Sequence, residues 1–405
     1  MSGESILLPL ASNFAPKIIQ LPASKSISNR ALIIHALAKG KSEITNLSEA
    51  RDTQTMIRLL KSESSVLDVL DAGTTMRFLT AFLAVTNQHK TITGTTRMKE
   101  RPIGILVDSL KSIGAQISYL EKEGYPPIKI EGFKDIGVKE INIRGDVSSQ
   151  YISALMMIAP QLKNGLNIYL EGKIGSRPYI DMTLSVMQHY GVKGAFNGNQ
   201  ISIGHQNYKD ATYSIEPDWS AASYWYSLVA LSKNSSITLS NLKPKAIQGD
   251  SVIVEIMNEL GVKTIFNQEG ALLTKSRHNP SFEYDFTHCP DLAQTVAVVC
   301  AAKGIRAKFT GLESLKIKET DRVKALQVEL KKIGATLSET RNQWELQPAK
   351  NPSWNKLMID TYEDHRMAMA FAPLCLLGEV EIKDPSVVNK SYPGYWDDFR
   401  KVGLV

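Results

Sequence analysis

Six segments of the chain share one pattern, in which a short polar cluster is followed by an apolar run of mostly small residues and then by a strand-like segment. The polar clusters are residues 25–30 (KSISNR), 73–77 (GTTMR), 148–151 (SSQY), 218–220 (DWS), 290–292 (PDL) and 364–366 (DHR). From residue 149 onward they recur roughly every 70 residues, long enough for a repeated unit of strands and helices. The pattern predicts a fold with six similar helix starts, whose polar residues can converge on one site.

These helix starts favour the binding of anions. Ser, Thr, Asp and Asn are preferred at the N-cap, where their side chains accept hydrogen bonds from free backbone N–H groups. The N-terminus of a helix also carries a partial positive charge and binds phosphate readily. For any one helix a simple cap is the plainer interpretation, but basic or acidic residues accompany most of the six. The set as a whole therefore favours a site for a small polyanion.

The composition is that of an ordinary globular protein. The 405 residues are 43% hydrophobic and 22% charged, and a chain of this length suits two domains. The net charge is +6, but blocks of consecutive basic residues, which are typical of nucleic-acid-binding tails, are absent from the sequence. Three of the polar clusters precede residue 200 and three follow it, and strand-like and helix-like segments alternate in each half. The sequence therefore predicts two α/β domains and a small anionic ligand rather than nucleic acid.

The cysteines and the apolar runs bear on the compartment. Cys289, Cys300 and Cys375 lack metal-site spacing, and their odd number argues against a disulfide framework. Cys300 and Cys375 fall in apolar helical runs, where buried thiols are expected. No apolar run reaches the roughly 18 residues of a membrane span, and residues 1–10 do not have the pattern of a signal peptide. We expect a cytoplasmic protein that does not contact membranes.

Two motifs place cations close together. Lys25, Ser26 and Arg30 fall within about one helical turn, and Arg is suited to bidentate pairing with phosphate or carboxylate. Lys318 and Arg322 are four residues apart and so share one helix face. Taken alone, the second motif is more often a salt-bridged surface helix. Both motifs nevertheless remain candidates for anion binding.

The cluster at residues 364–366 suggests a catalytic triad at first sight. However, the sequence has neither the strained Gly-x-Ser-x-Gly turn of a hydrolase nor a His-Glu-x-x-His metal motif. We therefore expect His365 to pack against or orient its neighbours, and Arg366 to be the better candidate for a ligand-binding residue.

The motifs occur in the order found in a known family. Nearly from end to end, the sequence resembles the 3-phosphoshikimate 1-carboxyvinyltransferases, the EPSP synthase family of enolpyruvyltransferases. The resemblance rests on residues 21–32, 72–77, 97–104, 145–151, 176–181, 290–291, 318–322, 364–368 and 388–393. One such segment would be weak evidence, whereas this many in register are strong.

The resemblance implies a fold of two domains, each made of three βαβαββ repeats arranged as an inside-out α/β barrel. One domain is expected to span residues 18–216. The other is expected to combine residues 1–17 with residues 217–405, so the N-terminal segment supplies a strand to the second half. Helix N-termini from both domains are expected to face a cleft that holds the active site and closes on substrate.

The implied reaction transfers the enolpyruvyl group of phosphoenolpyruvate to the 5-hydroxyl of shikimate 3-phosphate and releases phosphate. It belongs to the shikimate pathway, which leads to chorismate and the aromatic amino acids. Both substrates carry a carboxylate and a phosphate, which fits the gathered cations because desolvated anions are costly unless paired. The resemblance calls for neither a metal nor an organic cofactor and implies a monomer that binds only these small molecules.

The resemblance also implies the binding residues. Shikimate 3-phosphate is expected to contact Lys25, Ser26, Arg30, Ser148, Ser149, Gln150, Ser176, Asp291, Ser314 and Lys318. Phosphoenolpyruvate is expected to contact Lys25, Gly73, Arg101, Gln150, Arg322, Arg366 and Lys390. A glycine at position 73 is physically reasonable, since a backbone without a Cβ can approach a phosphate closely.

By the same resemblance, three residues are expected to carry out the chemistry. Asp291 is the predicted base for the 5-hydroxyl, and Glu319 the predicted acid that protonates the vinyl carbon, with both roles reversed in the elimination. Lys25 is expected to stabilise charge on the departing phosphate. The surrounding anions are expected to raise the pKa values of the carboxyl groups, which favours a protonated Glu319 near neutrality.

Four features depart from the family pattern. Asp71 stands where asparagine is expected, and we expect its side chain to turn away from the phosphate site or to bind a neighbouring cation. Phe78 stands where many members have proline, and Ser314 replaces asparagine or another polar residue. Between Leu60 and Asp71 the chain is short, so we expect a strand or hairpin to be missing. Gly73 still leaves room for glyphosate, which occupies the phosphoenolpyruvate site in this family, and we expect sensitivity to it.

Three other functions stay open. The enolpyruvyltransferase acting on UDP-N-acetylglucosamine shares the fold, but it usually carries a cysteine in the loop that corresponds to residues 95–104, and that loop has none here. An enzyme of the RNA phosphate cyclase type needs a nucleophilic histidine, for which His365 is the only motif candidate. A non-catalytic anion-binding relative fits less well because Asp291 and Glu319 are both present.

Overall fold

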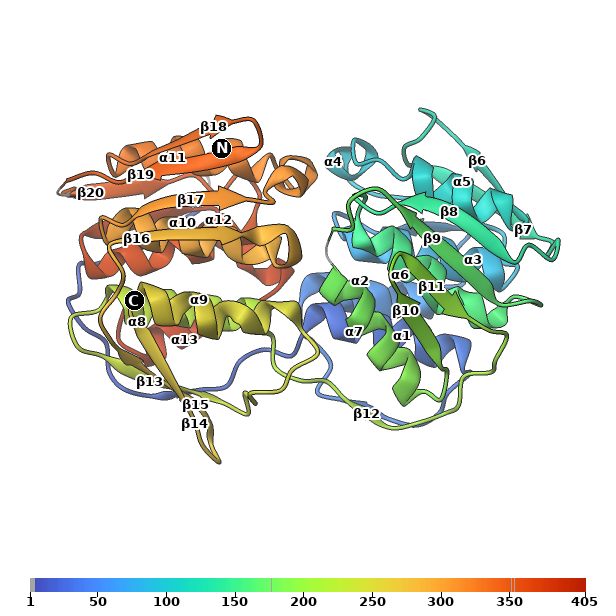
Figure 1. The fold of residues 1–405 in the computed structure, drawn as a ribbon, viewed down its shortest axis with the longest axis horizontal. Coiled ribbons are helices and arrows are strands. Elements are labelled where there is room, and N and C mark those ends of the chain that lie inside the picture. The colour runs from blue at the N-terminus through green and yellow to red at the C-terminus, as the bar shows by residue number, and fades with distance from the viewer. Residues whose placement is uncertain (1–3, 176, 351, 353) are drawn as a thin grey trace. The chain divides into compact units, whose positions relative to one another are not determined.

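The computed structural model describes residues 4–175, 177–350, 352 and 354–405 (Figure 1). The chain divides into two compact units. The N-terminal unit is Ala23–Ile215, and the C-terminal unit combines Met1–Pro22 with Glu216–Val405. Each unit has its own sheets and its own central helices, so each is described separately below.

The N-terminal unit contains seven α-helices and ten strands among its described residues. The helices are α1 (Lys25–Leu37), α2 (Arg51–Leu60), α3 (Gly73–Val85), α4 (Thr96–Lys99), α5 (Gly104–Ser112), α6 (Ser149–Ile158) and α7 (Arg177–His189). The strands are β3 (Ile44–Thr45), β4 (Val66–Asp68), β5 (Lys90–Thr93), β6 (Ala115–Tyr119), β7 (Ile128–Phe133), β8 (Glu140–Arg144), β9 (Leu166–Glu171), β10 (Gly194–Asn197), β11 (Gln200–Ile203) and β12 (Tyr213–Ser214). They form sheets in the orders β4-β5-β7-β6, β10-β11-β9-β8 and β12-β3.

In the C-terminal unit the helices are α8 (Trp219–Leu231), α9 (Ile253–Leu260), α10 (Ala293–Ala302), α11 (Arg322–Lys332), α12 (His365–Phe371) and α13 (Tyr395–Lys401). The strands are β1 (Ser5–Leu8), β2 (Ile18–Ile19), β13 (Ser236–Ser240), β14 (Val262–Phe266), β15 (Gly270–Lys275), β16 (Ser281–Asp285), β17 (Arg306–Thr310), β18 (Thr336–Thr340), β19 (Gln343–Gln347), β20 (Lys356–Ile359) and β21 (Glu379–Lys383). They form sheets in the orders β1-β21-β20, β14-β15-β13-β2 and β16-β17-β19-β18.

Three mutually contacting helices form the centre of each unit, namely α1, α3 and α6 in one and α8, α10 and α12 in the other. Almost every side chain of α3, α6, α8, α10 and α12 is buried. A helix that is apolar on all sides has to lie inside a protein, which explains why the small-residue helices are central (Figure 1). The predicted α/β fold with helices inside and sheets outside is therefore confirmed.

All six predicted helix starts are confirmed as the starts of these central helices. Five begin directly at the polar clusters, and α10 follows a single 3-10 turn at Pro290–Leu292. Each unit contains both capped and uncapped helix starts: Ser148 caps α6 by accepting from Gln150 N–H, and Leu292 provides no side-chain cap for α10. Among the described residues no side chain caps α1 or α3, whereas the carboxylates of Asp218 and Asp364 cap α8 and α12 by accepting from Ala221 N–H and Arg366 N–H.

The hairpin expected to be missing after residue 60 is indeed absent. Helices α5, α7, α9 and α11 are each followed by an antiparallel pair of strands, but α2 leads directly to β4. Consequently β3 pairs only with β12, in a two-stranded parallel sheet.

The N-terminal segment contributes strands to the second half, as predicted. Strand β1 pairs antiparallel with β21, and β2 pairs parallel with β13. The three cysteines are free and buried, which confirms the expectation for Cys300 and Cys375. Among the helices of the described chain, none has both the length and the apolar character that crossing a membrane requires.

Candidate active site

The predicted site residues are divided between the two units. The N-terminal half-site comprises Lys25, Ser26, Arg30, Gly73, Arg101, Ser148, Ser149 and Gln150, and the C-terminal half-site comprises Asp291, Ser314, Lys318, Glu319, Arg322, Arg366 and Lys390. Ser176, the remaining predicted ligand, lies outside the described residues. The two half-sites are considered one at a time.

The N-terminal half-site is built from the first turns of α1, α3 and α6. The side-chain amide of Gln150, on α6, donates to Thr74 Oγ1 on α3 at 3.0 Å. Lys25 Nζ, at the start of α1, lies 3.1 Å from Oδ2 of Asp52, a buried carboxylate on α2. These contacts tie neighbouring helix starts together, so the polar residues of separate repeats are held in a defined arrangement.

Arg30 is a buried cation with no carboxylate partner among the described residues. It is 2% exposed, and it donates from Nε to Thr183 Oγ1 at 2.8 Å, from Nη1 to the carbonyl of Ser26 at 2.8 Å and from Nη2 to Ser153 Oγ at 3.0 Å. Burial lowers the pKa of Arg30 to about 10. A buried guanidinium held by neutral groups alone still lacks a counter-ion, which an anionic ligand can supply.

Phe78 gains a structural explanation from Arg30. The Arg30 guanidinium lies over the Phe78 ring at 5.3 Å from its centroid, and over the Tyr179 ring at 5.9 Å. Both distances fall in the range of cation–π attraction. Phe78, which stands where the family resemblance led us to expect proline, therefore helps to hold the buried cation.

The loop at residues 95–104 is fixed by its backbone. The carbonyl of Pro102 accepts from Arg77 Nη2 at 2.9 Å and from the Tyr151 hydroxyl at 2.5 Å. The adjacent Arg101 is 8% exposed and lies so close to Gly73 that a Cβ at position 73 would be 2.7 Å from its guanidinium nitrogens. Glycine is therefore required for Arg101 to occupy this position.

Asp71 does bind a neighbouring cation, the second of the two outcomes expected for it. Its carboxylate lies 3.0 Å from Nη2 of Arg51 on α2. The pair is partly exposed, with 28% of the Asp71 side chain accessible. Because Arg51 offsets its charge, the aspartate adds little net negative charge beside Gly73.

Arg322 is the centre of the C-terminal half-site. It is 2% exposed and pairs with three carboxylates, through Nε with Asp364 at 2.6 Å, Nη1 with Asp291 at 2.9 Å and Nη2 with Glu319 at 2.8 Å. Burial alone lowers the pKa of Arg322, but the three carboxylates outweigh this effect and raise it. The predicted base and the predicted acid therefore contact the same guanidinium.

Asp291 is surrounded by cations. Besides Arg322, it pairs with Arg366 Nη2 at 2.8 Å, and Lys318 Nζ lies 3.9 Å away. Burial raises the pKa of Asp291, but Arg366, Lys318 and Arg322 together hold it well below its usual range. Asp291 is therefore ionised at neutral pH, as a base has to be. We expected bound anions to raise carboxyl pKa values, and without substrates the direction for Asp291 is the opposite.

The remaining predicted residues of this half-site differ in their burial and in their hydrogen bonds. Arg366 also donates to the Tyr224 hydroxyl and to the carbonyl of Asp291, both at 3.2 Å. Lys390 is buried at the end of the 3-10 helix Pro385–Lys390. Ser314 is half-buried and makes no hydrogen bond with any described residue.

Comparison of the sequence with known proteins identifies one family. The sequence model of the family described as EPSP synthase (3-phosphoshikimate 1-carboxyvinyltransferase) matches residues 15–62 and 59–399. A 3-phosphoshikimate 1-carboxyvinyltransferase of Bacteroides fragilis is 50% identical over 392 residues, which cover 95% of both chains. One of Methanospirillum hungatei is 35% identical over 412 residues, covering 94% of both. The chain belongs to the EPSP synthase family.

The fold also has a close counterpart among solved structures. An EPSP synthase structure from Acinetobacter baumannii superposes with a TM-score of 0.77 at 20% identity, covering 99% of this chain and 98% of the other. At this level of identity the match concerns the fold, which is that of the EPSP synthases. The resemblance recognised from the motifs is thereby confirmed.

Some residues that contact the candidate site residues were missed by the sequence analysis. Thr74 and Ser220 lie inside predicted helix starts, so their positions were signalled although their contacts were not. Asp52 and Asp250 lie outside every predicted polar cluster. Their proximity to Lys25 and Ser220 depends on tertiary packing, and nothing in the local sequence indicates it.

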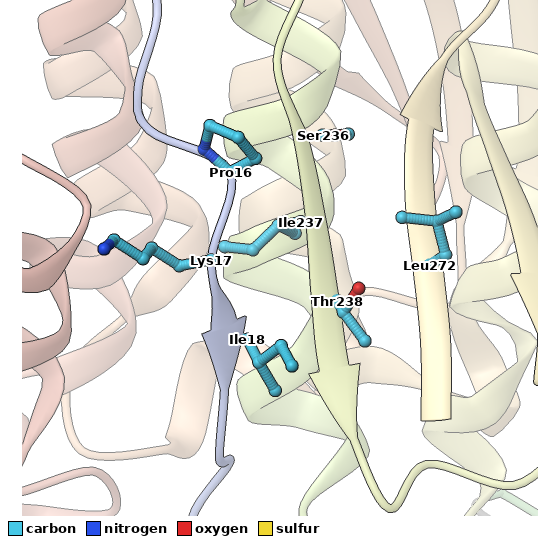
Figure 2. A pocket seen from close by; sticks show the side chains of 7 residues that line it. All are labelled: Pro16, Lys17, Ile18, Ser236, Ile237, Thr238 and Leu272. Carbon is cyan, nitrogen blue, oxygen red and sulfur yellow. The ribbon is translucent and has the colours of Figure 1, made fainter. Parts of the chain in front are cut away.

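A separate pocket of about 450 Å³ lies against the sheet β14-β15-β13-β2 (Figure 2). Figure 2 shows Ile18, Thr238 and Leu272 on three neighbouring strands along it. It includes none of the predicted site residues of the family. In the described part of the chain, no group of three or more His, Cys, Asp or Glu residues is arranged to hold a metal ion.

Proposed function

We infer that the chain catalyses the reaction of its family. It transfers the enolpyruvyl group of phosphoenolpyruvate to the 5-hydroxyl of shikimate 3-phosphate, giving 5-enolpyruvylshikimate 3-phosphate and phosphate. The observation that carries this inference is the contact of Asp291 and Glu319 with Arg322. These residues occur in a chain that is 50% identical, over 95% of its length, to a relative named 3-phosphoshikimate 1-carboxyvinyltransferase. A base, an acid and an anion-binding cation are the groups that the reaction requires.

In the proposed mechanism Asp291 takes the proton of the 5-hydroxyl, and Glu319 delivers a proton to the vinyl carbon of phosphoenolpyruvate. The contacts of Arg322 with both carboxylates support this pairing of roles. When anionic groups of the substrates approach Arg322 and Arg366, they share the cations that hold the pKa of Asp291 down. The pKa of Asp291 then rises, so the carboxylate becomes a stronger base once the substrates are bound.

We propose that shikimate 3-phosphate occupies the N-terminal half-site through Lys25, Ser26, Arg30, Ser148, Ser149, Gln150 and Ser176, together with Asp291, Ser314 and Lys318 of the other unit. The absence of a carboxylate beside Arg30 among the described residues supports a phosphate there. The first turn of α1 has no side-chain cap from Ser24, so the N-terminus of this helix can serve the same anion.

Phosphoenolpyruvate, in the same proposal, binds Lys25, Gly73, Arg101 and Gln150 from one unit and Arg322, Arg366 and Lys390 from the other. Lys25 also stabilises the phosphate as it leaves. We propose that the two compact units act as the two domains, which the sequence had placed at residues 18–216 and at 1–17 with 217–405. Because β2 (Ile18–Ile19) pairs with β13, we assign residues 18–22 to the second domain. Substrate binding would then close a cleft between these domains.

Three further statements belong to this proposal. The protein acts as a monomer on two small molecules, and glyphosate competes with phosphoenolpyruvate beside Gly73. It works in the cytoplasm, which the three free, buried cysteines support. The comparisons do not favour UDP-N-acetylglucosamine as the acceptor.

The test is phosphate release with both substrates, with each omitted, and with UDP-N-acetylglucosamine as the acceptor. Asp291→Ala and Glu319→Gln are measured beside Glu329→Gln, which alters a buried carboxylate of α11 that pairs with Lys332. Release that needs both substrates and is largely lost in the first two variants alone supports the reaction and the roles. No release by folded wild-type protein refutes the proposal.

A further inference from the structure

The polar cluster at residues 218–220 begins α8 and has no part in the proposed reaction. Its Ser220 lies between two charged groups. The Ser220 hydroxyl donates to Oδ2 of Asp250, and its oxygen accepts from Nη2 of Arg366 at 3.4 Å. The same Nη2 donates to Asp291 Oδ2 at 2.8 Å. A continuous chain of contacts therefore leads from Asp250 through Ser220 and Arg366 to the proposed base.

Asp250 is held firmly in this place. It lies in the 3-10 helix Gly249–Val252 and is 5% exposed. The preceding Gln248 accepts from Trp219 N–H at 3.1 Å and donates to the carbonyl of Pro217 at 2.8 Å. These bonds of the Gln248 side chain attach the segment of Asp250 to the backbone at the start of α8, so the position of Asp250 does not depend on the Ser220 bond alone.

The Arg366 guanidinium is 7% exposed, and Ser220 is one of its three side-chain partners given above, beside Asp291 and Tyr224. Tyr224 binds Nη1, whereas Ser220 and Asp291 bind Nη2. A hydroxyl that donates to a carboxylate presents its lone pairs to other donors, and here Arg366 is the donor. Asp250 thus determines which way Ser220 faces.

We propose that Asp250 and Ser220 are positioning residues for the reaction, holding the Arg366 guanidinium in the orientation that contacts Asp291 and phosphoenolpyruvate. This inference rests on the proposed function, in which Arg366 binds phosphoenolpyruvate. Neither residue touches the reacting atoms. Both act through Arg366, so removing either should weaken the binding of one substrate more than the other.

The electrostatics of Asp250 offer a second observable. The pKa of Asp250 is raised to about 7, chiefly by burial and also by the nearby Asp291 and Asp218, while Arg366 and Ser220 act in the opposite direction. Cys289 faces it as well. No Lys or Arg of the described chain forms an ion pair with Asp250, whereas Asp291 has three cations beside it, so Asp250 is the carboxyl that keeps the proton.

This shift has a definite sign. A carboxyl whose pKa is higher in the folded protein destabilises the fold as the pH rises from about 4, its unfolded value, toward 7. Asp250→Asn removes that cost. Relative to wild type, the melting temperature of Asp250→Asn should therefore increase between about pH 4 and pH 7 and then level off.

The kinetic experiment measures kcat and both KM values for wild type, Ser220→Ala, Asp250→Ala, the double variant, Ser220→Thr and the control Glu329→Gln. Each alanine variant should raise KM for phosphoenolpyruvate about three- to tenfold, the loss expected for one hydrogen bond, with KM for shikimate 3-phosphate within about twofold. The double variant should be no worse than the single ones, because both act on one contact. Ser220→Thr keeps the hydroxyl and should behave as wild type.

Unchanged KM for phosphoenolpyruvate in folded Ser220→Ala would overturn the inference while leaving the reaction intact, and so would multiplicative losses in the double variant. Ser220→Ala removes a single atom from a partly exposed side chain, so it decides the matter even if Asp250→Ala does not fold. A wild-type enzyme that releases no phosphate refutes the proposed function, and the inference with it.

Discussion

The two half-sites differ in how many of their arginines form ion pairs with carboxylates of the same unit. In the N-terminal half-site Arg30 and Arg101 form no ion pair within the described chain, and α1 and α3 begin without side-chain caps. In the C-terminal half-site Arg322 alone meets three carboxylates, and the helix starts of α8 and α12 are already occupied by Asp218 and Asp364. The N-terminal half-site thus pairs Lys25 with Asp52 but gives its two arginines no carboxylate within the described chain, whereas the C-terminal half-site surrounds Arg322 with three.

This difference separates two tasks. An anion binds well where cations and helix ends have no internal partner, because binding then replaces no existing contact. Proton transfer needs carboxylates, and carboxylates in a buried site need cations to hold them. The N-terminal half-site is therefore suited to hold a phosphate, and the C-terminal half-site to hold an acid and a base.

The largest expected effect is a loss of kcat, and it should differ between two buried carboxylates, one in each half-site. Asp291→Asn should lower kcat about 10²–10⁴-fold, the range of a lost general base. Asp52→Asn, which changes the partner of Lys25 in the other half-site, should lower it by no more than about tenfold, because asparagine can still accept a hydrogen bond from Lys25 and an ordinary hydrogen bond contributes about 0.5–1.5 kcal/mol. Equal losses in steady-state phosphate release would contradict the division of tasks.

The same substitution should affect folding differently in the two units. Arg322→Met leaves three carboxylates without their shared cation and should cost about 3–5 kcal/mol of unfolding free energy. Arg30→Met should cost at most about 1 kcal/mol, because losing three hydrogen bonds to neutral groups is partly offset by no longer burying an unpaired charge. Urea denaturation measures both, and the comparison fails if Arg30→Met is the more destabilised.

Inorganic phosphate should reveal the N-terminal half-site, in which Arg30 forms no ion pair with any described residue. At about 100 times its dissociation constant it should stabilise wild-type protein by about 2.7 kcal/mol, seen as a higher melting temperature. The gain should largely vanish in Arg30→Met. It should persist in Arg51→Met, which removes an exposed cation already paired with Asp71. Equal phosphate response in all three proteins would place the anion elsewhere.

Acid should affect the C-terminal half-site through Asp291. Because cations depress the pKa of Asp291 in the folded protein, its contribution to stability is present above about pH 4 and is lost as the pH falls further. Asp291→Asn should consequently lose less unfolding free energy than wild type between about pH 5 and pH 3. Parallel curves for the two proteins would show that Asp291 is not stabilised by its cations.

The smallest expected effect concerns Gly73. A Cβ there meets only the movable end of Arg101, so Gly73→Ala should fold normally while displacing that guanidinium. KM for phosphoenolpyruvate should rise by less than about tenfold, or 1.4 kcal/mol, and glyphosate should inhibit less. An alanine variant with wild-type KM and wild-type inhibition would show that Arg101 does not contact this substrate.

Much of the fold was predictable because it depends on local pattern. Small-residue helices such as α3 and α10 are apolar on every side, which can only be satisfied inside a unit. The missing hairpin after Leu60 follows from a segment too short to contain one. The roles assigned to Asp291, Glu319 and Lys25 stay predictions, supported by the contacts of Arg322 and Asp52.

The sequence by itself determined the six helix starts, the family and the chemical types of the site residues, because these depend on residue type and short spacing. Tertiary structure decided which charges are paired. Asp52 lies beside Lys25, Asp71 beside Arg51 and Asp250 beside Ser220, at sequence separations of 20 residues or more. The pKa of a carboxyl depends on the cations and the burial around it, and both are set only when distant helices pack together.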